Sequence, residues 1–265
     1  MKYSQLPFYQ IVAILNVWSL NLMKPIFYVM NFKLLISLIF PLLLLISACS
    51  KDEREGASEQ SFHTDFAAGK DNWVAGFADY SGNNVEIYEL KEGLSPLPEP
   101  LDTKRQAYML SGINRSDDLF MYLKKQLTGF KPLTTYSINF MIQLASDAIS
   151  GGVGAGGAPG EAVGIGVGAS VIEPLASANE NNFYQMNIDK MNQCCTDGED
   201  MVVIGNVANG GDVYEYKMLE RAGEFQVTTD AEGKIWVLVG TDSGYEGKTT
   251  LYYSTIGMRI TEVFD

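Results

Sequence analysis

The sequence has too few histidine and cysteine side chains for most metal or nucleophilic sites. Its 265 residues include three cysteines and one histidine, His63. A zinc site needs about four nitrogen, sulfur or oxygen ligands, and a Ser/His/Asp triad needs a histidine beside a serine and an acid. Cys194 and Cys195 lie 131 residues from His63 or more. Neither kind of site is therefore expected.

The two adjacent cysteines pose a separate question. A trans peptide bond holds neighbouring Cα atoms about 3.8 Å apart, and disulfides are unstrained only above about 4.4 Å. A vicinal disulfide between Cys194 and Cys195 would be strained, and the sequence leaves open whether it forms.

Basic residues are also scarce. The chain has 19 Lys and Arg against 32 Asp and Glu, a net charge of -13, and its three bases before Cys49 occur without any acid. From Cys49 onward the net charge is therefore -16. Because nucleic-acid binding rests on neutralising phosphates and anionic membranes attract basic segments, we expect neither nucleic acid nor membrane docking through protein charge.

No apolar run is long enough to span a membrane. The longest, residues 34–48, has 15 residues, whereas a spanning helix needs about 20. Lys33 precedes this run and small residues end it, which is typical of a secretory signal peptide.

Residues 46–49 (ISAC) resemble the bacterial lipobox, in which the cysteine thiol is acylated, with palmitate for example, and becomes the first mature residue. Cys49 is therefore the predicted lipidation site, and its acyl chains are the predicted contact with the membrane. Residues 51–53 (KDE) resemble the export signal of Bacteroidetes surface lipoproteins. That resemblance implies an outer-membrane lipoprotein facing the cell exterior, although the same residues would suit any solvated acidic linker.

Four segments are predicted. Met30 begins a compact signal peptide, so residues 1–29 are interpreted as an extension upstream of the true translation start. The segments are 1–29 (extension), 30–48 (signal peptide), 49–61 (acidic, flexible linker) and 62–265 (one β-sandwich domain).

The domain shows the period-two hydrophobicity of β-strands with one buried face. It is clearest over 136–144, where Tyr, Ile, Phe, Ile and Leu alternate with polar residues or Met, and it recurs from Tyr252 to Ile260. Gly, Asn, Asp and Pro clusters separate the strands. Further strands are predicted over 107–113, 116–127, 163–171, 183–188, 201–204, 225–229 and 235–239.

Residues 130–136 (FKPLTTY) resemble the Leu-x-Pro-x-Thr-x-Tyr strand entry of fibronectin type III domains and many carbohydrate-binding sandwiches. In those domains the tyrosine hydroxyl bonds to nearby backbone at a Greek-key corner. A fibronectin domain would end soon after Tyr136, yet 129 residues follow it. The resemblance therefore implies an all-β, jelly-roll or Greek-key β-sandwich of the carbohydrate-binding-module kind.

Two glycine-rich stretches need interpretation. Residues 151–160 contain the letters of a dinucleotide loop, but Pro159 and the glycines that follow exclude the helix that such a loop needs. This stretch is therefore a hairpin loop, and no cofactor is expected. In the next strand Gly164, Gly166 and Gly168 leave one face without side chains. We expect another chain segment to cover that face; a ligand platform is the alternative.

Candidate ligand-binding residues are aromatic side chains beside acids in Gly-rich loops. They are Trp73, Asp79, Tyr80, Asp242 and Tyr245. For Trp73 a place in the core is the stronger alternative, and Trp236, flanked by aliphatic residues, is assigned to the core. Asp242 and Glu246 could supply oxygen ligands to a structural calcium ion, although an Asp-Ser-Gly turn forms without metal.

The leading hypothesis is a non-catalytic binding module on a surface lipoprotein, with a glycan as ligand. A structural or adhesive surface protein with a protein ligand is the alternative. A glycan-active enzyme is the second alternative, although no local motif nominates the pair of carboxylates that it would need.

The lipid anchor makes a first testable prediction. Each buried acyl CH₂ contributes about 0.8 kcal/mol, so two or three chains anchor a protein stably. We expect Cys49→Ala to abolish both palmitate incorporation and signal-peptide cleavage, measured by metabolic labelling and by the mass of the precursor, whereas Ser50→Ala should be processed normally. Wild-type processing and anchoring of Cys49→Ala would exclude a lipoprotein.

Overall fold

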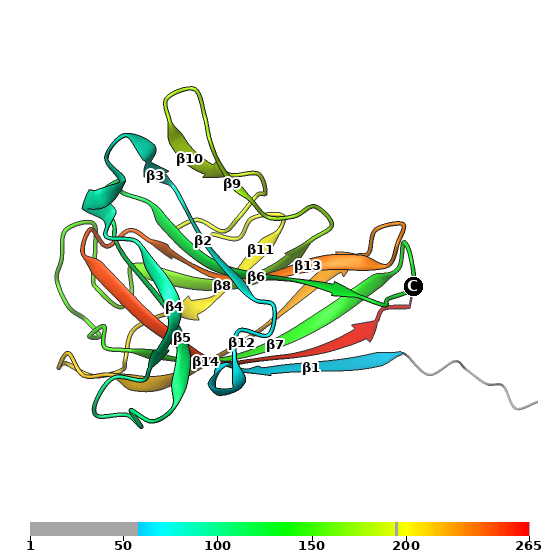
Figure 1. Cartoon of the computed structure of the whole chain (residues 1–265), viewed down its shortest axis with the longest axis horizontal. Helices are drawn as coiled ribbons and strands as arrows, with labels where there is room; N and C mark the ends of the chain where they lie inside the picture. Colours follow the sequence, from blue (N-terminus) through cyan, green and yellow to red (C-terminus); the bar gives the residue numbers. More distant parts are fainter. Residues whose placement is uncertain (1–57, 194–195, 265) are drawn as a thin grey trace, which may run out of the picture. The chain divides into compact units, whose positions relative to one another are not determined.

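A computed structural model describes residues 58–193 and 196–264, which form an antiparallel, all-β sandwich of two main sheets (Figure 1). The predicted fold class is therefore confirmed. The predicted extension, signal peptide, lipidation site at Cys49 and Cys194–Cys195 pair lie outside the described residues.

The first sheet, sheet A, has the strand order β12-β7-β14-β5-β4, and β1 pairs with the C-terminal half of β14. Its strands are β1 (Glu59–Asp65), β4 (Lys91–Pro96), β5 (Gln106–Ile113), β7 (Thr135–Ser146), β12 (Lys217–Thr228) and β14 (Lys248–Glu262).

The second sheet, sheet B, has the order β11-β8-β13-β6-β2. Its strands are β2 (Val74–Ala78), β6 (Leu119–Thr128), β8 (Val163–Ser170), β11 (Met201–Asn206) and β13 (Lys234–Ser243). A small third sheet, uppermost in Figure 1, has the order β3-β10-β9. It contains β3 (Tyr80–Ser81), β9 (Ala176–Ala178) and β10 (Phe183–Met186), and two 3-10 helices occur at Phe66–Ala68 and Gly82–Tyr88.

Every strand predicted from the sequence is present, including the one at 116–127, which has a helical alternative in its spacing and forms β6. The strands without a clear apolar alternation, β1 to β4 and β9, were not predicted. β1 begins at Glu59, three residues before the predicted domain start at Phe62. No helix in the described part of the chain is long and apolar enough to span a membrane.

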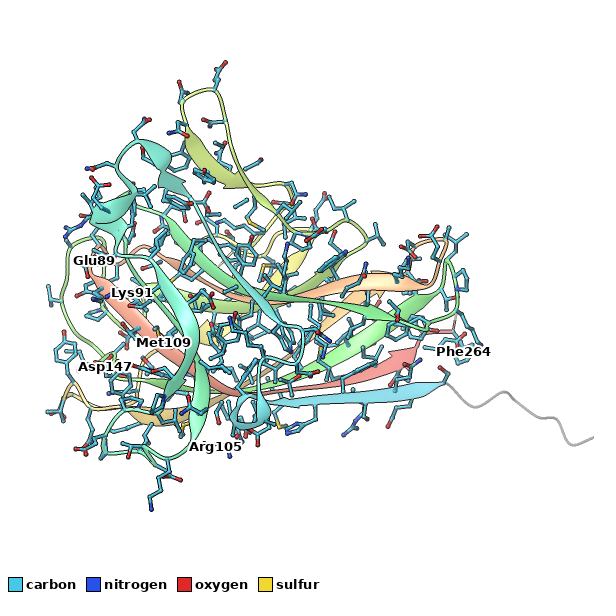
Figure 2. All side chains as sticks on the ribbon, in the orientation of Figure 1. Glu89, Lys91, Arg105, Met109, Asp147 and Phe264 are labelled. Atoms are coloured by element: carbon cyan, nitrogen blue, oxygen red, sulfur yellow. The ribbon has the colours of Figure 1, made fainter. Side chains whose placement is uncertain are left out.

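The alternation over 136–144 is confirmed, because Tyr136, Ile138, Phe140, Ile142 and Leu144 of β7 are all buried between the sheets. In Figure 2 side chains from both sheets fill the space between the ribbons.

The predicted face of β14 is only partly right. Ile256, Met258 and Ile260 point into the core as predicted, but N-terminal to them the inward residue is Tyr253, not Tyr252. A register shift between Tyr253 and Thr255 marks a β-bulge, and a one-residue insertion turns each earlier side chain to the opposite face.

The bulge is tied to the edge of sheet A by Arg105, which Figure 2 labels beside β5. Its Nε donates to Ser254 Oγ at 3.1 Å, and its Nη2 lies 2.7 Å from Asp65 Oδ1. One guanidinium therefore joins the bulge of β14 to the end of β1.

The corner motif is confirmed. The Tyr136 hydroxyl accepts a hydrogen bond from the backbone N–H of Lys131 at 3.1 Å, and the Tyr136 ring packs 5.1 Å from that of Phe130. The tyrosine thus fixes the turn that leads into β7, as the resemblance implied.

Of the two tryptophans in the described residues, Trp73 lies in the core and Trp236 does not. Trp73, a candidate ligand residue, is only 1% exposed, and its Nε1 donates to Thr64 Oγ1 at 3.0 Å, so the ligand interpretation is wrong and the core alternative holds. Trp236 was assigned to the core but lies half-buried on the outer face of β13, with Lys124 Nζ 5.3 Å from its ring centroid. Side chains alternate between the two faces of a strand, and Ile235 and Val237 point inward, so Trp236 between them points outward.

The glycine face of β8 is covered by the chain itself, as expected. All eight residues of β8 are buried. A Cβ atom on Gly166 would overlap Met191 Sδ and the Val202 carbonyl, and one on Gly168 would overlap the Asp200 carbonyl. The covering residues lie within 188–193 and 196–202, two described stretches that together we call the cover segment.

The burial of Trp73 generates a stability prediction. Trp73→Ala should lower the free energy of unfolding by about 3–5 kcal/mol, because it removes a large core side chain and leaves a cavity. Tyr214→Ala, at a position 62% exposed, should change it by less than about 0.5 kcal/mol. Chemical denaturation measures both, and equal effects would contradict the assignment of Trp73 to the core.

The contact between β8 and the cover segment generates a second prediction. Gly168→Ala should lower the free energy of unfolding by about 1–3 kcal/mol, because the new methyl group meets backbone that must shift. Gly257→Ala is the matched control, since a Cβ atom there has its nearest neighbour at 3.7 Å. If Gly168→Ala is as stable as Gly257→Ala, the cover segment does not press on β8.

Candidate functional site

A depression of about 690 Å³ crosses the outer face of sheet A. It runs over β12, β7, β14 and β1, four adjacent strands that together span about 14 Å. We call it the sheet A groove. It is lined by residues 61–62, 139–141, 222–224 and 257–259.

Strand register orders these residues into two rows. In the first row Glu224, Asn139, Arg259 and Ser61 lie side by side across the four strands. In the second row the corresponding residues are Ala222, Met141, Gly257 and His63. The first row is polar. In the second row Ala222 and Gly257 are small and leave the floor of the sheet A groove open.

The polar groups of the first row are accessible to a ligand. Asn139, Glu224 and Arg259 are exposed. Glu224 accepts a hydrogen bond from Ser137 Oγ at 2.6 Å. Within residues 58–193 and 196–264, Arg259 and Asn139 form no side-chain hydrogen bond or ion pair. An amide and a guanidinium together offer several donors and one acceptor at a fixed spacing.

The apolar part of the sheet A groove is small and contains no exposed aromatic ring. Met141 is 51% exposed at the centre of the second row. Phe140 is buried and Phe62 packs against the core, so both face inward. The arrangement suits a flat, hydroxyl-rich ligand that is held mainly by hydrogen bonds. The Met141 thioether can in addition contact an apolar ring face of such a ligand.

The structure brings together two of the predicted ligand residues, Asp79 and Asp242, but away from the sheet A groove. They lie at one end of sheet B with Asp118, and the ammonium group of Lys190 sits among the three carboxylates. Asp79 is 7% exposed and Asp242 is fully buried, so Asp242 does not meet an external ligand directly.

The electrostatics of this cluster are strongly perturbed. Burial raises the pKa of Asp242 to about 8, the neighbouring Asp118 adds to the rise, and Lys190 opposes it. Burial likewise raises the pKa of Asp79. For Lys190 burial lowers the pKa, but the three carboxylates outweigh it and the pKa is raised overall.

The remaining predicted ligand residues lie elsewhere. Tyr80 is half-buried and stacks on Tyr184, with ring centroids 4.8 Å apart. The loop over 151–160 joins β7 of sheet A to β8 of sheet B, so it is not the hairpin that the sequence predicted. Tyr245 is half-buried against this loop, where the Glu246 N–H donates to the Ala155 carbonyl at 2.9 Å. Tyr245 also lines a small pocket of about 110 Å³.

The predicted pairing of Asp242 with Glu246 around calcium is not what the structure shows. Asp242 points under the cover segment to Lys190, whereas Glu246 is exposed in the loop beyond β13. Among the described residues, the three acids close enough to share a metal ion are Asp79, Asp118 and Asp242, and Lys190 already lies between them.

Sequence reasoning missed the sheet A groove because it looked for aromatic residues in loops. The available signal was the outward set of the two clearest strands, which includes Asn139, Met141, Gly257 and Arg259. Strand pairing makes β7 and β14 neighbours and places β12 and β1 on either side of them. These pairings join residues that are more than 80 positions apart in the sequence.

No family model matches the chain. No curated protein matches it either. Among solved structures it is similar to carbohydrate-binding-module β-sandwiches. One is the xylan-binding module CBM22-1 of Paenibacillus barcinonensis Xyn10C, with 11% identity, 79% of this chain and 97% of that chain covered, and a TM-score of 0.35.

A second is TmCBM27, a carbohydrate-binding module described for mannan recognition, with 9% identity, 77% and 98% coverage and a TM-score of 0.33. A third is the enzymatically active domain of the bacteriophage CBA120 tailspike protein 4, with 7% identity, 71% coverage of this chain and a TM-score of 0.32; the match spans only 19% of the tailspike chain. At these identities and scores the likenesses say nothing about a ligand of this chain.

Proposed function

We propose that this protein is a non-catalytic glycan-binding module, and that the sheet A groove is its binding site. The observation that carries the proposal is the row Glu224–Asn139–Arg259 across three adjacent strands, exposed beside the open floor at Gly257. Sugar hydroxyls both donate and accept hydrogen bonds, and this row offers carboxylate, amide and guanidinium groups to them.

The composition of the sheet A groove favours binding over hydrolysis. Glycosidases of the usual kinds place two carboxyl groups about 5–9.5 Å apart across the scissile bond. Among the described residues that line the groove, Glu224 is the one carboxylate. The groove can therefore hold a glycan but lacks the second acid that such hydrolysis needs.

The lipobox-like residues 46–49 and the KDE residues 51–53 support the location that we propose, a lipid anchor on the outer membrane with the module facing outward. Only nine residues separate Cys49 from β1. A connection of that length spans at most about 33 Å, so the module would act close to the membrane surface.

The proposal predicts weak binding, because the sheet A groove is shallow and wet. We expect a dissociation constant of about 0.1–1 mM, measured by calorimetry after a glycan array identifies a ligand. The double variant Asn139→Ala/Arg259→Ala should weaken binding at least about tenfold, since a hydrogen bond to a charged group contributes about 1.5–3 kcal/mol. Its thermal midpoint should stay near that of the wild type, because both side chains are exposed.

Two controls sharpen this test. Lys91→Ala removes one positive charge on β4, far from the sheet A groove (Figure 2), and should leave binding unchanged. Tyr245→Ala tests the loop instead. If Tyr245→Ala abolishes binding and Asn139→Ala/Arg259→Ala does not, the assignment of the binding site to the sheet A groove is wrong. A glycan array with no signal would overturn glycan binding and favour a protein partner.

A further inference from the structure

The charged cluster beneath the cover segment is assembled from three neighbouring strands. Asp79 directly follows β2, Asp118 directly precedes β6, and Asp242 lies near the end of β13, so the order β13-β6-β2 gathers them at one end of sheet B. Lys190 reaches them from the cover segment. Its side chain is 13% exposed, and that of Asp242 is fully buried.

Within this cluster Lys190 and Asp242 are in direct contact. Lys190 Nζ forms an ion pair and hydrogen bond with Asp242 Oδ2. It also lies 3.0 Å from Asp79 Oδ2 and 3.7 Å from Asp118 Oδ1. One oxygen of each of the three carboxyl groups lies within 4.8 Å of the others. The Lys190 ammonium group thus lies within ion-pair distance of three carboxyl groups.

Apolar residues flank Lys190 and Asp242. Asp242 is opposite Phe120 on one neighbouring strand and Gly164 on the other. The Phe120 ring centroid is 5.0 Å from Lys190 Nζ, and Ile188 and Met191 of the cover segment are buried beside it. In the described part of the chain Asp242 Oδ1 has no hydrogen-bond partner. Keeping the Lys190 ammonium group in such a place costs desolvation free energy, and joining it to Asp242 as an amide would remove its charge.

We propose that Lys190 and Asp242 condense to an intramolecular isopeptide bond between Nζ and Cγ, with Asp79 as the base and Asp118 beside the reacting carboxyl. The site is made of this chain's own residues, and the reaction needs no other reactant. The inference is independent of glycan binding.

The Asp79 carboxylate takes one proton from the Lys190 ammonium group, and the freed amine lone pair attacks Cγ of the neutral Asp242 carboxyl. The N–C bond forms and the C–OH bond breaks. The departing hydroxyl takes a second proton from the nitrogen and leaves as water, through the pocket that Asp79 and Asp118 line. An amide and a protonated Asp79 remain, and charge is conserved.

The protonation states favour this step. With its pKa raised to about 8 by burial, Asp242 is largely a neutral carboxyl at neutral pH, which is the form that an amine can attack. Asp118 contributes to that rise, and one of its carboxyl oxygens lies within 4.8 Å of an Asp242 oxygen, so it helps to keep the reacting carboxyl protonated. Because the pKa of Lys190 is raised, the amine is released only by a nearby base, and Asp79 is 3.0 Å away.

The bond would have a structural consequence. Lys190 and Asp242 are 52 residues apart, and a covalent link between them closes that length of chain, which restricts the unfolded state. It would also fix the cover segment over the glycine face of β8. A protein outside the cell would gain a cross-link that reducing conditions do not break.

Mass spectrometry of the full wild-type chain, purified folded and then denatured, tests the proposal. We expect the chain to be lighter by one water molecule than its residues require. After trypsin digestion, peptide 235–248 should be joined to the peptide that contains Lys190, and cleavage after Lys190 should be absent. Reading the linkage in peptides makes the result independent of lipidation or signal-peptide cleavage.

Lys190→Arg is the matched control, since it keeps the positive charge but should not form the amide, and Asp242→Ala removes the acceptor carbon. Both should show separate peptides, and Asp79→Ala should show slow or incomplete linkage. Separate peptides and cleavage after Lys190 in the folded wild type would overturn the proposal, whether or not the variants fold. A loss of water that persists in Lys190→Arg would also overturn it.

Discussion

Every part of this structure depends on one constraint, which is that two antiparallel sheets share a single apolar layer. Each sheet therefore buries its inner face in that layer, and its outer face must be either covered by other parts of the chain or exposed to solvent. The inward residues of β7, β8, β13 and β14 meet in that layer and are almost completely buried. Because side chains alternate along a strand, the residues that point into the apolar layer also determine which residues point outward. The two sheets then treat their outer faces differently.

Sheet B covers its outer face with the chain itself. The glycines of β8 have no side chains with which to build a polar surface, and the cover segment packs on them through Met191 and the Asp200 backbone. That contact closes over Asp79, Asp118 and Asp242, and Lys190 is the cation that accompanies them. Burial of charge here follows from the covering of the glycine face.

Sheet A instead leaves part of its outer face to solvent. The bulge at Ser254 lets β14 pair with β5 along its first half and with β1 along its second half while keeping apolar residues inward in both halves. Arg105 holds the bulge to β1. The exposed part is therefore a continuous surface of four strands. On it Asn139 and Arg259 lie side by side and line the sheet A groove.

The sequence by itself determined the all-β class, the central strands and the Tyr136 corner, because alternation and turn chemistry are local properties. It also indicated that the glycine face is covered. It did not determine that Trp73 is core and Trp236 is not, that Asp79 and Asp242 meet, or that Asn139 and Arg259 share a groove. Those facts depend on which distant strands pair, on where β14 inserts an extra residue, and on where the cover segment comes to rest. Only the tertiary structure decides them, because each requires burial and register between residues far apart in the chain.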